Sequence, residues 1–366
     1  MAPSNDEKFM RAALRLARKG VGFTSPNPAV GAVIVRNNKI LARGYHKGAG
    51  RAHGEIEAFN ALKGGSAKGA TLYVTLEPCC VFGRTPPCTK AVIGAGVKKA
   101  VVGSMDPNPA VAGRGVRELQ SAGIQVRTGV LEKECLAINE GYVKFITTGL
   151  PLVTLKLAAS LDGRIATAAG ESKWITGEGA RGYVHRLRAA VDAVMVGAGT
   201  VLKDDPALTA RPVKGGSKNP ARVVVDSAFR TPLKAKVFRD IEGSGLYIFT
   251  TGRAKSAKIN KARALGARVF VMREAAGGIA LGGVLKRLGR EEITSIIIEG
   301  GAGLAASAIK EGIVDKVLWF TSPKILGGDA TPAVAGLGIR SLKKAPVIKG
   351  ARVRRMGDDI LIEGYF

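Results

Sequence analysis

The stretch "RAHGEIEAFNAL", residues 51–62, has helical spacing and places His53 and Glu55 near its start. Two thiols, Cys79 and Cys88, follow within "TLEPCC" and "GRTPPC". Imidazole and thiolate are preferred zinc ligands, and a catalytic zinc site keeps one coordination position for water. A glutamate two residues from the histidine is close enough to move protons for that water. The pattern H-x-E…P-C…C is typical of zinc-dependent nucleobase deaminases.

A purely structural interpretation of these residues has to be weighed against the metal site. A histidine can begin a helix, a glutamate in the first turn balances the helix dipole, and cysteines can be small buried apolar residues. The combination of "HGE", "TLEPC" and a second downstream cysteine favours the metal site instead. Eight residues, "CVFGRTPP", separate the two cysteines, and the chain contains no C-x-x-C motif. It therefore differs from the cytidine and base-editing deaminases.

Several longer motifs resemble one known family, the bifunctional riboflavin-biosynthesis deaminase–reductases. In the first part these are "NPAVGAVIV" (27–35), "TLEPC", "GRTPPC" and "DPNPAVAGRG" (106–115). "LKLAASLDGRIA" (155–166), "GESKWIT" (170–176), "VGAGTVLKDDPALTAR" and "EGGAGLAAS" (299–307) continue the resemblance over nearly the whole chain. It implies an N-terminal cytidine-deaminase-like three-layer α/β/α domain and a C-terminal dihydrofolate-reductase-like α/β domain.

The resemblance also implies roles for residues of the first domain. His53, Cys79 and Cys88 are the expected zinc ligands, and Glu55 is the expected proton shuttle. The residues expected to face the pyrimidine and phosphoribose are Asn27, His46, Arg84, Asp106 and Asn108. Asparagine and aspartate suit the donor–acceptor edge of an aminopyrimidinone. Simple turn chemistry is the competing explanation for "SPNP" and "DPNP".

Two departures from the family pattern lie beside the expected zinc ligands. The family commonly shows "PCSH" where this chain has "PCCV", so Cys80 and Val81 replace a serine and a histidine. Cys80 could compete as a ligand, although Cys79 keeps its place. "HGE" stands for the commoner "HAE", and we expect this change to cost little because either small residue fits.

For the second domain the resemblance implies an NADPH site and a substrate site. The residues expected to face NADPH are Ala158, Trp174, Thr200, Asp204, Ser227, Gly301, Ala302, Gly303, Leu304, Ala305, Ala306 and Ser307. The expected substrate residues are Ser172, Arg188, Leu208, Arg211 and Glu299. Backbone amides of the glycine-rich turn before a helix suit a pyrophosphate, and the two arginines can grip a phosphate. "GGAGLA" alone is a weak match to a dinucleotide fingerprint, so a Rossmann fold is not predicted.

Alternation of β-branched and helical segments predicts two α/β domains, residues 1–149 and 150–366. The first should begin with an amphipathic helix and end with one helix over 132–149. The second should hold seven strands from "PLVTLKLAAS" to "KVLWF" with helices between them. A β-hairpin should close the chain at 351–366.

The formal charge of +27 raises the alternative of a zinc-dependent nucleic-acid deaminase. The excess is spread out, +11 over residues 1–149 and +16 over 150–366, and aromatic residues make up only 5%. We therefore expect no nucleic-acid partner, and the resemblance implies a small phosphorylated pyrimidine substrate. A binding module with a structural zinc is a second alternative, which would need Cys80 as fourth ligand. No signal peptide or membrane span is apparent, so we expect a cytoplasmic protein, and we expect a homo-oligomer.

Overall fold

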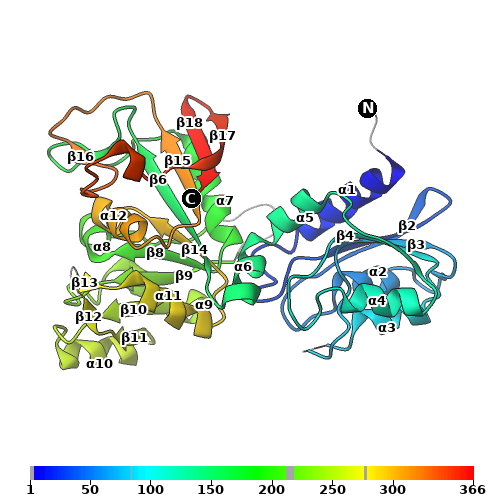
Figure 1. Ribbon diagram of the computed structural model, residues 1–366. Coiled ribbons are helices and arrows are strands. Elements are labelled where there is room, and N and C mark those ends of the chain that lie inside the picture. Colours follow the sequence, from blue (N-terminus) through cyan, green and yellow to red (C-terminus); the bar gives the residue numbers. More distant parts are fainter. Residues whose placement is uncertain (1–3, 84, 212–217, 276–277) are drawn as a thin grey trace. The chain divides into compact units, whose positions relative to one another are not determined.

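The computed structural model describes residues 4–83, 85–211, 218–275 and 278–366. The chain forms two compact units, Met1–Gly149 and Leu150–Phe366, each built around its own sheet (Figure 1). None of the described helices combines the length and the apolar character that crossing a bilayer would require.

Within the described residues, the first unit contains a five-stranded sheet with strand order β2-β1-β3-β4-β5. Its strands are β1 Gly31–Arg36, β2 Lys39–Tyr45, β3 Thr71–Leu76, β4 Lys99–Ser104 and β5 Gln125–Arg127. β1 pairs antiparallel with β2 and β3, whereas β3, β4 and β5 run parallel. The parallel strands bring the loops that follow β3 and β4 to the same edge of the sheet.

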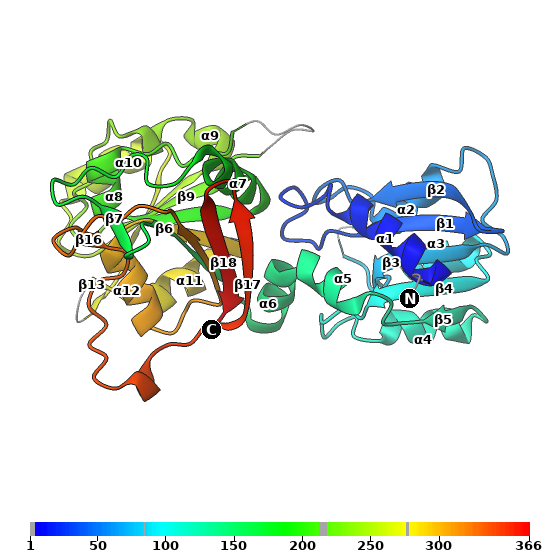
Figure 2. The same cartoon turned by 90° about the horizontal axis from the view of Figure 1, so that it is seen from above.

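Helices cover both faces of this sheet, as Figure 2 shows. They are α1 Asn5–Ala17, α2 Gly54–Asn60, α3 Cys88–Gly94, α4 Arg114–Ser121, α5 Glu132–Ile138 and α6 Glu140–Thr148. Ala58, Val92 and Leu119 place α2, α3 and α4 in the core on one face. Met10 and Cys135 place α1 and α5 in the core on the other. The expected three-layer α/β/α architecture is confirmed.

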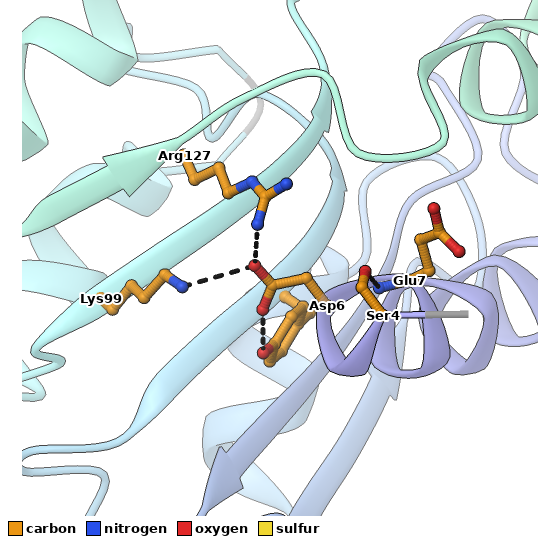
Figure 3. Close-up of polar contacts among 6 residues, drawn as sticks. Ser4, Asp6, Glu7, Lys99 and Arg127 are labelled. Carbon is orange, nitrogen blue, oxygen red and sulfur yellow. Dashed lines mark hydrogen bonds and ion pairs between the residues drawn. The ribbon is translucent and has the colours of Figure 1, made fainter. Parts of the chain in front are cut away.

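A buried carboxylate fixes α1 against the sheet (Figure 3). Asp6 accepts a hydrogen bond of 2.7 Å from Tyr73 Oη on β3 and ion pairs with Arg127 (2.7 Å) and Lys99 (3.4 Å). Burial would raise the pKa of Asp6, but the hydrogen bond and the two cations hold it below its usual value. Ser4 caps the helix by accepting from the Glu7 amide.

In the described part of the second unit, nine strands form one sheet of order β11-β10-β9-β8-β14-β6-β15-β18-β17. The strands are β6 Leu152–Ala159, β8 Ala193–Gly197, β9 Ala221–Val225, β10 Leu246–Thr250, β11 Arg268–Val271, β14 Ser295–Glu299, β15 Lys316–Thr321, β17 Lys349–Met356 and β18 Asp359–Tyr365. All are parallel from β11 to β15, and the β17–β18 hairpin adds antiparallel to β15. The closing hairpin is therefore confirmed.

Residues alternate along the parallel strands between two apolar layers. Met195 of β8 packs with α11 and α12 on one face, and Val194 packs with α10 on the other. α7 covers the β15–β18 end through Val184. The helices are α7 Glu178–Ala190, α8 Ala198–Asp204, α9 Ile241–Ser244, α10 Ser256–Ala264, α11 Leu281–Arg290 and α12 Ala302–Lys310. Two small ribbons pair β7 Arg164–Ala166 with β16 Thr331–Pro332, and β12 Glu274–Ala275 with β13 Gly278–Ile279.

The prediction of one helix over 132–149 is wrong, because the chain breaks between α5 and α6 at Asn139. This buried side chain accepts from the Ala29 amide (2.8 Å) and donates to the Ala29 carbonyl (3.1 Å). A side chain that satisfies another segment's backbone outweighs local helical propensity. β2, β5, α4, α8 and α9 were not predicted. Only Ala42 and Gly44 of β2 are buried, and neither is a large apolar residue, so β2 lacks the apolar pattern by which strands are recognised.

Candidate active sites in the two units

Three loop and helix ends of the first unit bring the expected zinc ligands together. His53 is the N-cap of α2, Cys79 follows β3, and Cys88 is the first residue of α3. Their ligand atoms all lie within 4.8 Å of one another. The Nδ1 atom of His53 is 3.2 Å from the Cys88 sulfur and 3.6 Å from the Cys79 sulfur. One nitrogen and two sulfurs converging on a single point fit a zinc ion with a fourth position left for water.

Neighbouring groups orient these ligands. Thr85 Oγ1 lies 3.3 Å from Nε2 of His53, which leaves Nδ1 facing the two sulfurs. The Cys88 amide donates to the Cys79 sulfur at 3.4 Å. Chiefly because the Cys88 thiol also donates to it, the pKa of Cys79 falls to about 4. The site is thus prepared to present a thiolate.

Glu55 lies in the first turn of α2 and is 3% exposed. Its Oε2 atom has no hydrogen-bond partner among the described residues. Burial, and then the negative charge of Cys79, raise the pKa of this carboxyl to about 7. A buried carboxylate with one oxygen unpartnered is costly, and such groups are concentrated at functional sites.

Glycines explain how closely α2 approaches the sheet. A Cβ atom on Gly54 would lie 2.7 Å from the Val30 carbonyl oxygen, and one on Gly44 would lie 2.2 Å from the Ala58 nitrogen. Both contacts are with backbone atoms, which cannot rotate away. The expectation that alanine would fit equally well in "HGE" is therefore wrong for this backbone.

Of the five residues expected to contact substrate, Asn27 and His46 lie beside the metal ligands. The ring centroids of His46 and His53 are 5.1 Å apart in an edge-on arrangement. The Nε2 atom of His46 is 3.4 Å from the side-chain amide nitrogen of Asn27. Asp106 and Asn108 instead use their side chains in a turn. Asp106 accepts from the Asn108 amide and from Tyr142 Oη, both at 2.9 Å. Arg84 lies outside the described residues.

Glu77, in the centre of "TLEPC", was not singled out from the sequence. Its two oxygens accept from the backbone amides of Asp106 (3.2 Å), Gly113 (2.9 Å) and Val116 (3.0 Å). It therefore ties the loop after β4 and the start of α4 to the segment that carries Cys79. The signal was present in the motif, since a glutamate between a buried strand and a ligand needs partners of its own.

Cys80 is partly exposed and is absent from the group of possible metal ligands that the described residues form. Burial raises the pKa of its thiol, which disfavours the thiolate that zinc binding needs. Its neighbours in space therefore do not prepare it as a fourth ligand.

In the second unit, a buried ion pair joins α7 to the end of β14. Arg188 donates from Nε and Nη2 to the two oxygens of Glu299, at 2.7 and 2.8 Å, and from Nη1 to the Thr209 carbonyl at 3.1 Å. Burial would raise the pKa of Glu299, but the Arg188 charge and hydrogen bonds hold it below its usual value. Arg188 is thus engaged on three sides, whereas Arg211 is exposed.

Two further ionisable residues of this cluster were missed from the sequence. Lys156 on β6 is the direct register partner of Glu299, and burial lowers its pKa. His185 is one turn before Arg188 on α7, and its Nδ1 is buried with no hydrogen-bond partner among the described residues. The charges of Arg188 and Arg211 act on it, after burial, to lower its pKa. Lys156 lies within "LKLAASLDGRIA" but was not singled out there, and His185 lies outside the quoted motifs.

Four of the residues expected to face NADPH fall on consecutive strands of the sheet. Ala158 lies near the end of β6, Gly301 follows β14, Thr200 follows β8 and Ser227 follows β9. The sheet order is β9-β8-β14-β6, so the four positions form a row along the carboxyl edge. Ligands of open parallel sheets bind at this edge.

The turn between β14 and α12 fits a pyrophosphate. Gly300 and Gly301 both have φ of 75°, and a Cβ atom on either would lie 3.2–3.3 Å from Thr200 Oγ1. Gly301 caps α12 without a side-chain hydrogen bond. The amides of the first turn of α12 are therefore available to an anion.

The remaining residues expected to contact NADPH or substrate differ in how exposed they are. Ser172 donates to Asp204 at 3.2 Å, and Trp174 is 60% exposed. Leu208 is buried in the core, so only its backbone can reach a ligand. Ala305 and Ala306 are also buried, whereas Ala302 and Leu304 are partly exposed and Gly303 and Ser307 are exposed.

Comparisons with known proteins agree with both sites. Residues 3–104 match the cytidine and deoxycytidylate deaminase zinc-binding region, and residues 151–362 match the RibD C-terminal domain. The riboflavin biosynthesis protein RibD of Aquifex aeolicus is 43% identical, with 98% of this chain and 97% of that protein covered. RibD of Escherichia coli is 41% identical, with 98% of each covered.

Solved structures show the same relationship. RibD of Acinetobacter baumannii superposes with a TM-score of 0.88 at 37% identity, covering 99% of this chain and 98% of that one. A diaminohydroxyphosphoribosylaminopyrimidine deaminase/5-amino-6-(5-phosphoribosylamino)uracil reductase of Thermotoga maritima gives 0.88 at 36% identity with the same coverage.

Fold and site thus define a zinc-site deaminase joined to a reductase. The chain belongs to the RibD family of riboflavin biosynthesis proteins. It is a bifunctional enzyme with a cytidine-deaminase-like domain and a RibD-type reductase domain.

Proposed function

We propose that the Met1–Gly149 unit hydrolyses 2,5-diamino-6-(5-phosphoribosylamino)pyrimidin-4(3H)-one to 5-amino-6-(5-phosphoribosylamino)uracil and ammonia. The convergence of His53, Cys79 and Cys88 beside the unpartnered Oε2 of Glu55 carries this proposal. The T. maritima relative supports the choice of substrate, because its name states that reaction.

Each residue of this site has one task in the hydrolysis. His53 Nδ1 and the two sulfurs would hold zinc, which when bound activates the water that replaces the amino group. Oε2 of Glu55 takes a proton from that water and delivers it to the departing amine. Asn27 and His46, which lie beside His53, orient the pyrimidine.

We further propose that the Leu150–Phe366 unit reduces the ribosyl group of the uracil product to ribityl. NADPH would lie along the row from Ala158 to Ser227 and supply the hydride when bound. Arg188 holds Glu299 in place, so that the carboxylate can accept hydrogen bonds from the sugar hydroxyls. Lys156, the register partner of Glu299 in the sheet, is the candidate to supply a proton to the opened sugar.

The two arginines expected to grip phosphate differ in how many of their donors are already used. Three of the five N–H groups of Arg188 already donate to Glu299 and Thr209, so Arg188 has fewer donors left for a phosphate than an arginine without such partners. Arg211 is exposed, and we propose it as the phosphate ligand of the pair.

One experiment tests the proposal against its alternatives. The purified protein is mixed with the diaminopyrimidine substrate with and without NADPH, while ammonia release and NADPH oxidation are followed. We expect ammonia in both mixtures and NADPH oxidation only after deamination. A structural zinc would give neither signal. A nucleic-acid deaminase would release ammonia from single-stranded DNA and not from the pyrimidine.

The cellular location and the oligomeric state of the chain are predictions from its sequence. We propose a cytoplasmic homo-oligomer, which sedimentation of the purified protein and fractionation of cells would test.

A further inference from the structure

Arg253 lies just after β10, one strand beyond the strands that carry the expected cofactor residues. The row from Ala158 to Ser227 ends at β9, and β10 is the next strand in the sheet. Its carboxyl end continues as Thr251, Gly252 and Arg253. Neighbouring strands lie about 4.8 Å apart, so the ends of β8 and β10 are separated by about 10 Å. If the pyrophosphate occupies the turns after β14 and β8, the adenosine half reaches toward the ends of β9 and β10.

Hydrogen bonds fix the loop after β10 against Ser227. The Ser227 carbonyl accepts from Thr250 Oγ1 (3.1 Å), Thr251 Oγ1 (2.8 Å) and the Thr251 amide (3.1 Å). Both threonines are fully buried. Thr251 Oγ1 also accepts from the Arg253 amide at 3.3 Å. The Arg253 backbone is therefore fixed two residues after Thr251, whose amide and hydroxyl both donate to the Ser227 carbonyl.

A second contact completes the cluster. Gly278 approaches Ser227 so closely that a Cβ atom on it would lie 3.1 Å from the Ser227 hydroxyl. Gly278 is in β13, which pairs with β12, and Glu274 of β12 forms an ion pair with Arg253 at 2.8 Å. The two side chains are 54% and 47% exposed, so solvent weakens the pair and an incoming dianion can replace the carboxylate.

We propose that Arg253 recognises the 2′-phosphate of NADPH and thereby sets the preference for NADPH over NADH. The inference rests on the proposed function, because it assumes the cofactor lies along the row. An arginine beside the adenosine ribose is the usual means by which dinucleotide sites accommodate a 2′-phosphate, and its planar fork suits that group. Glu274 acts against binding, since it competes for the same guanidinium.

Calorimetry of the full-length protein with two mononucleotides tests this without turnover. Adenosine 2′,5′-bisphosphate carries the 2′-phosphate and 5′-AMP lacks it. We expect Arg253→Ala to weaken binding of the bisphosphate at least tenfold and binding of 5′-AMP by less than twofold. Glu274→Gln should strengthen binding of the bisphosphate twofold or more. Lys255→Ala removes an exposed cation two residues further on and should change neither, which controls for general charge.

The outcomes separate this inference from the proposed function. If wild type binds both mononucleotides equally, the preference for NADPH itself is wrong. If wild type discriminates but Arg253→Ala discriminates as well, only the assignment of Arg253 fails. Equal weakening of both ligands would make Arg253 a structural residue, and an effect of Lys255→Ala as large as that of Arg253→Ala would reduce the site to diffuse charge.

Discussion

Two buried glutamates, Glu55 in the first unit and Glu299 in the second, have opposite pKa shifts. Glu55 is 3% exposed with one oxygen unpartnered, and its pKa rises to about 7. Glu299 is 7% exposed with both oxygens bound by Arg188, and its pKa falls below the usual value. Burial is nearly the same, so the partner decides the direction.

The difference matches the task of each residue. A carboxylate that must exchange protons during a reaction benefits from having one oxygen without a fixed donor. A carboxylate that must stay charged and positioned benefits from a bidentate arginine. The two sites thus use the same side chain as a proton carrier and as a fixed acceptor.

Removing the proton carrier should have the largest effect. Glu55→Gln keeps the shape of α2 and all three zinc ligands, so zinc content should remain stoichiometric. Deamination should fall by about 10²–10⁴-fold, the range of a lost general acid–base group. Ammonia release measures deamination, and metal analysis measures zinc content. Reduction of supplied 5-amino-6-(5-phosphoribosylamino)uracil should be unchanged. Deamination near the wild-type rate would refute the role of Glu55.

The comparison can also be tested at Glu299, by removing the arginine that distinguishes it from Glu55. Arg188→Met leaves a buried carboxylate without its partner, which costs about 3–5 kcal/mol of stability. Both tryptophans, Trp174 and Trp319, are in the second unit, so urea unfolding followed by tryptophan fluorescence reports that unit alone. Arg188→Met with Glu299→Met should recover much of the loss. If the double variant is no more stable than the single one, the lost partner is not the cause.

The dependence of stability on pH should also weaken in this variant. In wild type the pKa of Glu299 is lowered in the folded state, so its contribution is present above its unfolded pKa of about 4.3 and is lost as pH falls through the lowered value. Without Arg188, the Lys156 charge remains to oppose the effect of burial, so the stability that Glu299 contributes above about pH 4.3 should be smaller than in wild type. Urea midpoints at a series of pH values, compared with wild type, measure the slope. A slope equal to that of wild type would show that Arg188 does not control Glu299.

The contrast also explains what the sequence could predict. His53, Glu55, Cys79 and Cys88 lie within 36 residues of one another and carry a recognisable pattern. Arg188 and Glu299 are 111 residues apart, and no pattern in the sequence indicates that they pair. Long-range polar partners escaped prediction elsewhere too, since Asn139 breaks a helix to reach Ala29. Motifs report local chemistry, whereas such pairs arise only when the sheet is assembled.

A single methyl group should disturb the first site to a lesser degree. Gly54→Ala places Cβ 2.7 Å from the Val30 carbonyl oxygen, so α2 must shift with His53 and Glu55. Overpacking of this kind costs about 1–3 kcal/mol. Zinc affinity and ammonia release should both decline, while tryptophan fluorescence unfolding stays as in wild type. Unchanged zinc affinity and activity would mean that the backbone yields at no cost.

The phosphate contact in the second site should have a smaller effect again. Arg211→Ala should lower reductase kcat/KM at least about tenfold, since a charge-assisted bond is worth roughly 1.5–3 kcal/mol and ~1.4 kcal/mol corresponds to that factor. Arg211→Lys should recover part of it, because lysine lacks the planar fork. A substrate without the phosphate should be nearly indifferent to the change. Equal penalties on both substrates would make Arg211 structural.

The smallest effect is expected at Cys80, and it tests whether the first site is open. Cys80 lies outside the ligand group that the described residues form, and its thiol is disfavoured as a thiolate. Cys80→Ser should therefore keep stoichiometric zinc and full deamination, whereas Cys88→Ser should lose both. A catalytic zinc needs its fourth position for water, while a structural zinc fills it with a protein ligand. Equal zinc loss in the two variants would mean that Cys80 closes the site. Glu55 would then have no water to serve, and its unpartnered oxygen would need another explanation.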